Sequence, residues 1–127
     1  LRILLRKQNA ERKYDILKDI YPDYKYNVIF QSHTYSRTLK FRKKFKLVLK
    51  KFDKVYMLDV FSSMREEKSK DYQKKVDNYF RCFNKFDEGV IKKIDKTKNE
   101  VWVFLGAGNA SEYLKLFQNM HKEVVKI

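Results

Sequence analysis

Nearly continuous apolar runs alternate with amphipathic helical segments along this chain, and this alternation limits the folds that it can adopt. The strand-like apolar runs occupy 26–31, 54–60, 79–83 and 100–105. Helical patterns cover 10–21, 38–52, 66–77 and 86–95, and a last one follows 106–108. Strands without inside–outside alternation are typical of parallel sheets that are covered on both faces, and helical connections allow successive strands to run parallel. We therefore predict an α/β fold, a Rossmann-like three-layer domain with a mostly parallel sheet.

The helix expected over 38–52 has the clearest pattern, with Thr38 as the expected cap at its start. Lysines fill its polar face, and the apolar residues at helical spacing predict a buried face formed by Phe41, Phe45, Val48, Leu49 and Phe52.

Composition indicates a single basic domain. A chain of 127 residues with 43% hydrophobic content is expected to form one domain, 1–127, with its own core. It carries 30 Lys and Arg against 16 Asp and Glu, and the net charge of +14 attracts polyanions. The lysines, however, are scattered over the polar faces of the expected helices, and no nucleic-acid-binding module is recognisable. Nucleic acid is therefore not the expected partner, and a basic nucleic-acid-binding α/β module is kept as the alternative.

Cysteine content and hydropathy exclude several classes of protein. The single cysteine, Cys82, excludes an internal disulfide and a cysteine-based zinc cluster. It lies in an apolar run, which favours a buried structural thiol over a nucleophile. The apolar runs are too short to span a membrane, no signal peptide is visible, and no membrane partner is expected. Because the sequence starts at Leu1 rather than at a methionine, we expect a piece of a longer protein.

The stretch from Phe30 to Thr38 carries the strongest functional signal. An apolar run ends there in hydroxyl groups, a histidine and an arginine, just before a helical pattern. Ligands of open α/β sheets bind where the strands end, and helix N-termini there attract anions. Arg37 can bind a carboxylate or phosphate through two parallel hydrogen bonds, and His33 can add a further donor. A polar turn without a ligand is the alternative interpretation.

Two further candidates belong to the same predicted edge of the sheet. Gly106-Ala107-Gly108 follows a strand and precedes a helix, but it lacks the spacing of a full dinucleotide-binding fingerprint. A tight left-handed turn, with Asn109 as the helix cap, is the simpler interpretation. Asp59 closes the strand 54–60 and is a candidate to orient Arg37 or a substrate amine. A capping or ion-pair role is the alternative for Asp59.

Three segments occur in an order and spacing that resemble a known family. They are FQSHTYSRT at 30–38, YMLDVF at 56–61 with Arg65-Glu66-Glu67 after it, and VFLGAGN at 103–109. The bacterial UDP-N-acetylmuramate–L-alanine ligases carry similar segments: FQPHTYSRT, LLDIYPAREK, and a closing strand with a GAG(N/D) turn. Ser32 stands where the family usually has proline. The resemblance runs from about residue 11 to residue 118, and the first motif is the specific one.

The resemblance implies a part of a cytoplasmic, ATP-dependent enzyme of bacterial peptidoglycan biosynthesis. The family joins L-alanine to the lactyl carboxylate of UDP-N-acetylmuramate through an acyl phosphate, with Mg²⁺ stabilising the charge. Its members have three domains, and this chain resembles only the C-terminal domain, which closes over the active site. ATP and Mg²⁺ would then be bound mainly by the N-terminal and central domains, which are the implied partners together with the two substrates.

The motif match also implies roles for individual residues. It makes Arg37, and next His33, the candidates to contact a substrate carboxylate or phosphate, with Asp59 as a third. Residues Gly106, Gly108 and Asn109 are implied to line the same nucleotide or phosphate edge. No residue of this chain is assigned as catalytic or as a metal ligand.

Two departures from the family pattern limit the expected activity. The chain has no GxxxxGK[ST] phosphate loop, so the domain alone is expected to lack ligase activity. The family's C-terminal domain usually opens with a DDYAHHPTE-like motif, which residues 4–10, LLRKQNA, do not match. A non-catalytic interaction or remnant domain is therefore the second alternative function.

Overall fold

A parallel sheet lies at the centre of the domain. The computed structural model describes residues 2–6, 10–60, 70–94, 99–106, 112, 115–116 and 124–126. Its strands are β1 Arg2–Arg6, β2 Lys25–Gln31, β3 Lys54–Met57, β4 Asn84–Lys85, β5 Glu100–Gly106 and β6 Val124–Lys126. In this part of the chain they form one sheet in the order β4-β3-β2-β5-β1-β6, and every paired strand runs parallel to its neighbour.

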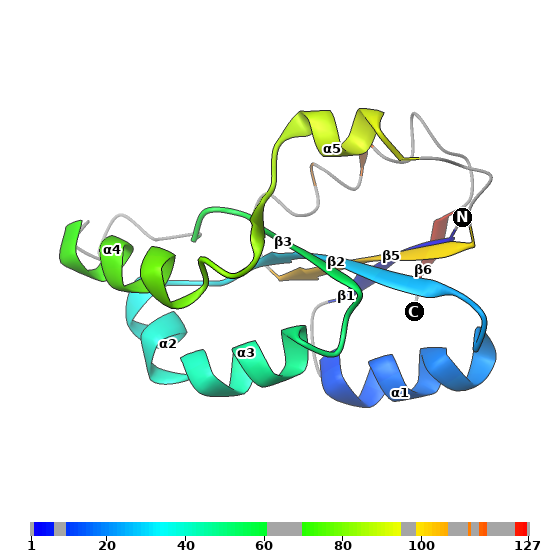
Figure 1. Ribbon diagram of the computed structural model, residues 1–127, viewed down its shortest axis with the longest axis horizontal. Helices are drawn as coiled ribbons and strands as arrows, with labels where there is room; N and C mark the ends of the chain where they lie inside the picture. The colour runs from blue at the N-terminus through cyan, green and yellow to red at the C-terminus, as the bar shows by residue number, and fades with distance from the viewer. Residues whose placement is uncertain are drawn as a thin grey trace.

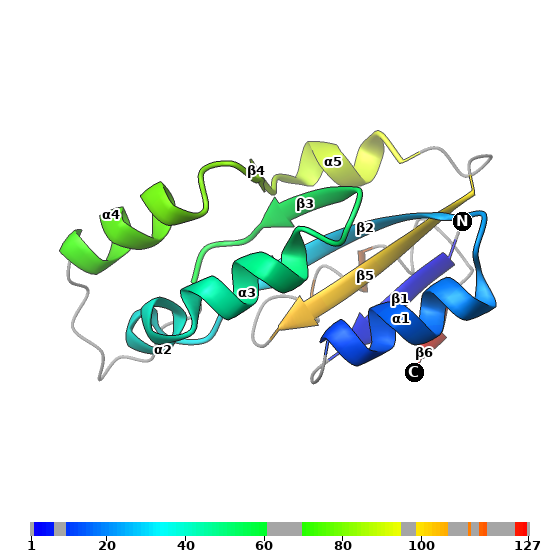
Figure 2. The same ribbon diagram turned by 60° about the horizontal axis from the view of Figure 1, so that its bottom comes forward.

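Helices cover both faces of this sheet (Figure 1). Their bounds are α1 Ala10–Ile20, α2 Tyr35–Lys40, α3 Arg42–Leu49, α4 Lys70–Tyr79 and α5 Glu88–Lys92. The helices α1, α2 and α3 lie on one face, and α5 lies on the other. Figure 2 shows α4 beyond the end of β3, next to α2. This arrangement confirms the predicted three-layer, Rossmann-like α/β fold.

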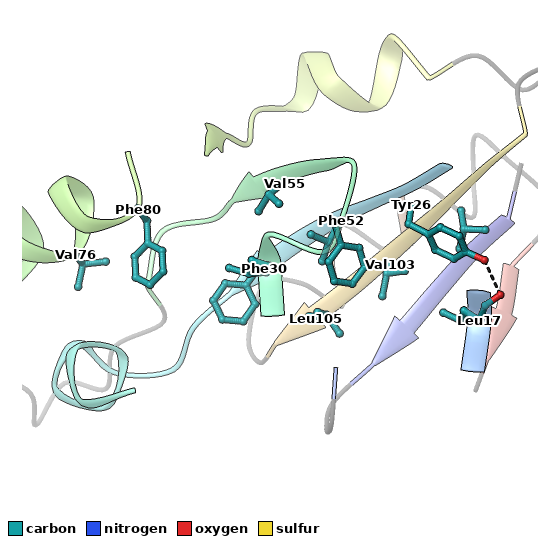
Figure 3. Close-up of a cluster of buried hydrophobic side chains, with 12 residues drawn as sticks. Leu17, Tyr26, Phe30, Phe52, Val55, Val76, Phe80, Val103 and Leu105 are labelled. Atoms are coloured by element: carbon teal, nitrogen blue, oxygen red, sulfur yellow. Dashed lines mark hydrogen bonds between the residues drawn. The ribbon is translucent and has the colours of Figure 1, made fainter. Parts of the chain in front are cut away.

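The two central strands, β2 and β5, supply the core of both layers. Their side chains alternate between the faces although both strands are apolar throughout. One cluster packs under α1 and α3 and includes Tyr26, Val28, Phe30, Val101, Val103 and Leu105 (Figure 3). The smaller cluster on the α5 side consists of Ile29, Ile91, Trp102 and Phe104. The larger cluster therefore fastens the layer of α1, α2 and α3 to the sheet.

A buried tyrosine ties the C-terminal end of α1 to the sheet. The side chain of Tyr26 is fully buried, and its hydroxyl donates to the backbone oxygens of Leu17, at 2.6 Å, and Tyr21, at 2.7 Å. Figure 3 shows the bond to Leu17. These carbonyls lie at the end of α1, and each also accepts a backbone N–H, from Tyr21 at 2.7 Å and from Tyr24 at 3.3 Å. Burial, followed by the neighbouring hydroxyl of Tyr14, raises the pKa of Tyr26 to about 12.

The expected helix over 38–52 is wrong in its bounds. The chain forms two helices instead of one. The first, α2, begins three residues earlier than expected, and Phe41 (φ −105°, ψ 15°) separates it from α3. The change of direction at Phe41 leaves its side chain 39% exposed, whereas the sequence pattern placed it on the buried face. Leu49 and Phe52 are buried as expected.

The strand expected over 79–83 is also wrong. The helix α4 extends to Tyr79, and the backbone N–H of Phe80 still donates to the oxygen of Val76, at 3.0 Å. A turn follows, closed by a bond from the Phe83 N–H to the Phe80 oxygen, before the short strand β4. Because Cys82 lies in this turn rather than in a strand, its thiol is exposed and not buried as predicted.

The remaining elements differ from the predictions mainly at their ends. The helices α1 and α5 and the strands β2 and β5 are confirmed within two or three residues, whereas β3 ends at Met57 instead of residue 60. The first residues of the helix expected over 66–77 lie outside the described residues. The strands β1 and β6 were not predicted, because each is a short run between charged residues.

The Tyr26 hydroxyl should make stability depend on pH in the alkaline range. The folded-state pKa lies above the usual value of 10, so the unfolded chain ionises first and stability falls as pH rises from about 10 toward 12. Tyr26→Phe should cost about 1–3 kcal/mol at pH 8, since two backbone acceptors lose a buried donor. The difference in unfolding free energy between wild type and variant, measured with urea, should narrow between about pH 8 and pH 11. The exposed Tyr72, changed to Phe, is the control, and a constant difference for Tyr26→Phe would contradict this assignment.

Candidate functional site

The carboxyl ends of β2, β3 and β5 meet at one edge of the sheet. Gln31 pairs with Gly106, and Phe30 pairs with Met57, so the three strands end at nearly the same level. The contact continues past β3, where the backbone N–H of Leu58 donates to the Phe30 oxygen at 2.8 Å. The segments that follow the strands are therefore brought together at this carboxyl edge, as expected for parallel strands.

Gly106 marks the level at which β5 leaves the sheet. Its φ is +128°, a conformation that L side chains rarely adopt, and a Cβ at this position would lie 1.9 Å from the backbone oxygen of Gln31. Only glycine allows the two central strands to approach this closely at the edge. Gly106 is still the last residue of β5, and the turn predicted over 106–108 stays a prediction, because Gly108 and Asn109 lie outside the described residues.

The turn after β2 is held by three hydroxyl groups. Thr34 has φ 60° and ψ 143°, which is unusual for a β-branched residue, and its side-chain oxygen accepts from the Arg37 N–H at 3.3 Å. Thr34 is therefore the cap of α2, and the expectation that Thr38 is the cap was wrong. Thr38 lies inside α2, fully buried, and its hydroxyl donates to the Thr34 backbone oxygen and hydrogen-bonds the Ser32 hydroxyl.

This network gives a physical reason for Ser32. Its side chain is only 4% exposed, and a hydroxyl buried at that position needs a partner, which Thr38 provides. Satisfied polar groups thus fix the path of the chain between β2 and α2, and the strained conformation of Thr34 persists because its neighbours hold it.

Arg37 and His33 lie on either side of this turn. His33 is two residues beyond β2 and exposed, and Arg37 is exposed in the first turn of α2. Among the residues that the structure describes, the guanidinium of Arg37 forms no hydrogen bond or ion pair. Its five N–H donors are thus available to an anion at the edge.

Asp59 lies at the same edge but two residues beyond the end of β3, so it does not close that strand as expected. The side-chain amide of Gln31 donates to the backbone oxygen of Asp59 at 3.0 Å, which fixes this segment beside β2. Within the described part of the chain, the carboxylate of Asp59 is not paired with Arg37, and it is exposed. The structure thus brings His33, Asp59 and Gly106 to one edge, and their roles in binding stay predictions.

A pocket of about 150 Å³ opens beside this edge, between the turn after β2, the end of β3, and α4. Of the predicted site residues, only Asp59 lines it, and His33, Arg37 and Gly106 lie outside. Its polar lining includes Ser32, Thr38, Asp59, Asp77, Arg81 and Lys85. The two carboxylates and two cations allow the pocket to accept both a cationic and an anionic group of a small ligand.

Sequence reasoning missed the pocket residues that follow α4. Arg81 was hidden by the strand expected over 79–83, which placed it in the sheet, whereas it lies in the turn after α4. Lys85 lies beyond that expected strand, and the structure places it in the short strand β4. Asp77 gave no signal, because a charged residue at the end of a polar helix is ordinary. Their contribution depends on where α4 lies, next to α2, which no local pattern indicates.

The described residues contain neither a metal-ligand cluster nor a membrane-spanning helix. No group of three His, Cys, Asp or Glu side chains that could hold a metal ion occurs among them. None of the helices within the same residues is long and apolar enough to cross a bilayer.

Comparison with known proteins identifies relatives. A UDP-N-acetylmuramate–L-alanine ligase of Lactobacillus helveticus is 36% identical over 100 residues, which is 79% of this chain, and that of Lactobacillus acidophilus matches equally. The ligase of Ligilactobacillus salivarius is 32% identical over 116 residues, 84% of the chain. This chain is homologous to a segment of the UDP-N-acetylmuramate–L-alanine ligases. The resemblance inferred from the three motifs is thereby confirmed.

The homology covers a minor part of these ligases. The chain spans 23% of the two Lactobacillus enzymes and 24% of the Ligilactobacillus enzyme. No family model matches the chain. The relationship is therefore one between this domain and a segment of a much longer ligase.

Replacing Gly106 should destabilise the domain. Gly106→Ala combines an unfavourable φ with a clash against the Gln31 oxygen, and we expect a loss of at least about 2 kcal/mol of unfolding free energy. Gly89→Ala, in α5, is the matched control, because its Cβ would meet only the end of the Asp87 side chain. It should change stability by less than about 1 kcal/mol. Urea unfolding of both variants measures the contrast, and equal losses would contradict it.

The hydroxyl network of the turn should be measurable as a coupling. Thr38→Val keeps the shape but removes the hydroxyl, and it should cost about 1–3 kcal/mol, whereas Thr38→Ser, which keeps the hydroxyl, should cost less. In a double-mutant cycle with Ser32→Ala, the two losses should be non-additive by at least about 0.5 kcal/mol. Additive losses in urea unfolding would show that the two hydroxyls act independently.

Proposed function

We propose that this chain is the C-terminal, substrate-closing domain of an ATP-dependent ligase that adds L-alanine to UDP-N-acetylmuramate. The observation that carries the proposal is the homology to ligases of this name at 32–36% identity over about four fifths of the chain. Because the chain spans less than a quarter of these relatives, the reaction belongs to a parent protein and not to this domain alone.

The carboxyl edge of the sheet is the surface that the proposal assigns to the substrates. Arg37 projects from a turn fixed by buried hydrogen bonds, and its guanidinium is not paired within the described residues. A guanidinium in this state can bind a carboxylate or a phosphoryl group with two parallel hydrogen bonds. His33 and Asp59 on the same edge offer a donor and an acceptor to the remaining polar groups of the substrates.

In this proposal the domain binds and closes over substrates, while the chemistry that needs ATP takes place elsewhere. The chain has no phosphate-binding loop of the P-loop type, and its described residues hold no cluster of three metal-ligating side chains. We therefore assign the binding of ATP and Mg²⁺ to the other domains of the parent enzyme. We place that enzyme in the cytoplasm. When bound, they would supply the phosphoryl group that activates the lactyl carboxylate.

The first test is the gene itself, since the proposal requires a continuous reading frame upstream of Leu1 that encodes a P-loop domain. In that full-length protein, Arg37→Ala should lower kcat/KM for L-alanine by about 10- to 100-fold, because a charged hydrogen-bonding partner is lost. Release of ADP that depends on L-alanine and UDP-N-acetylmuramate is the measurement.

The exposed Lys92 on α5, changed to Ala, is the control for Arg37→Ala and should leave kcat/KM within about twofold. A start codon close to Leu1 without a P-loop domain would refute the enzyme function for this chain. Full activity of the Arg37→Ala ligase would instead refute the site assignment alone.

A further inference from the structure

The outer face of α3 presents lysines around an exposed leucine. Lys43, Lys44, Leu47 and Lys50 recur at the spacing of one helical face, and all four are exposed. Leu47 is 69% exposed, the largest exposed fraction among the big apolar residues of the described part of the chain. In Figure 2 the helix α3 lies in front of the sheet, so the side of the helix opposite the sheet faces outward. We call this set of four residues the α3 outer face.

The orientation of this face is fixed from the opposite side of the helix. Leu49 is buried in the core, and Phe45 packs against Phe30 with ring centroids 5.4 Å apart. On the flank, the Lys46 ammonium donates to the Tyr79 oxygen at 3.1 Å and lies 4.5 Å from the centre of its ring. The α3 outer face therefore cannot turn inward without breaking contacts with both the core and α4.

The segment that contains α3 has no acidic residue to balance its positive charge. Residues 24–52 contain nine lysines and arginines and no aspartate or glutamate. Within the described part of the chain, the side chains of Lys43, Lys44 and Lys50 form no hydrogen bond or ion pair. The lysines of the α3 outer face are thus exposed and carry no side-chain partner among the described residues.

We propose that the α3 outer face binds the surface of an anionic lipid bilayer. Lysines near such a surface are attracted by the headgroup charge, and an apolar side chain between them can enter the interface. Because α3 runs along the outside of the layer, its four side chains can reach a flat surface together. The partner is then a membrane that the domain lies on, which is compatible with the absence of a spanning helix among the described residues.

A nucleic acid fits this face less well. Phosphates would neutralise the lysines but would leave Leu47 in water, so the exposed leucine would gain nothing. The face carries no arginine, the residue best suited to bidentate contacts with phosphates and bases. The proposal departs from the expectation of no membrane partner, which rested on the lack of a spanning segment. It does not depend on the proposed ligase function.

Co-sedimentation of the chain with vesicles tests the proposal. Vesicles of equal parts phosphatidylcholine and phosphatidylglycerol should bind the chain, and vesicles of phosphatidylcholine alone should not. The triple variant Lys43→Gln, Lys44→Gln, Lys50→Gln should bind the anionic vesicles on the order of 100-fold more weakly. Leu47→Ala should weaken binding by about fivefold at unchanged charge.

A second triple variant matches the charge change on other surfaces. Lys74→Gln, Lys92→Gln and Lys93→Gln alter exposed lysines of α4 and α5 and the residue after α5, and they should change binding by less than about fivefold. All the replaced residues are exposed, so thermal unfolding followed by circular dichroism should be unchanged and would identify any variant that fails to fold.

Four outcomes would overturn the proposal. The first is an absence of binding to the anionic vesicles at low salt. The second is equal weakening by both triple variants, which would indicate attraction to the net charge alone. The third is binding that Leu47→Ala does not weaken, which would make the face a general polyanion surface. The fourth is binding to duplex DNA without binding to vesicles, which would make it a nucleic-acid surface.

Discussion

The parallel pairing of β2 with β5 is the constraint on which the rest of the domain depends. The two strands pair along their whole length, from Lys25 with Glu100 to Gln31 with Gly106. Their residues are buried on both faces, so a shift by one residue would move the side chains of the larger cluster to the opposite layer. This register determines which side chains of the strands pack against each layer of helices. It also determines where the carboxyl edge lies.

The same pairing connects the fold to the candidate site. Gly106 allows β5 to approach Gln31 at the level where the site begins, and Gln31 in turn holds the Asp59 segment through its side-chain amide. The turn from Ser32 to Thr38 is fixed by buried hydroxyls, which leaves Arg37 exposed on a rigid support. Only the backbone of Arg37 is ordered in this way, and its exposed side chain keeps its rotamer freedom.

Two surfaces of the domain therefore differ in origin and in the partners that suit them. The carboxyl edge brings together polar side chains that follow β2 and β3 beside the end of β5, because parallel strands end at the same edge. The α3 outer face arises from helical periodicity, with core residues on one side and lysines on the other. The first is the surface proposed for the substrates, and the second is the surface proposed for an anionic bilayer.

The sequence by itself determined the layers of this protein, because strands that are apolar on both sides must be covered on both sides. It also supplied the FQSHTYSRT segment, the most specific of the three segments that carry the resemblance to the UDP-N-acetylmuramate–L-alanine ligases. The tertiary structure decided the points on which the local patterns were ambiguous or gave no indication. Phe41 breaks the long helix, Thr34 rather than Thr38 caps α2, and Arg81 enters a pocket because α4 packs next to α2. The pocket depends on a contact between two helices that are far apart in the sequence, which no local pattern indicates. The cap at Thr34 involves Arg37, only three residues away, but the polar turn offers several residues that can cap a helix, and the sequence pattern did not distinguish them.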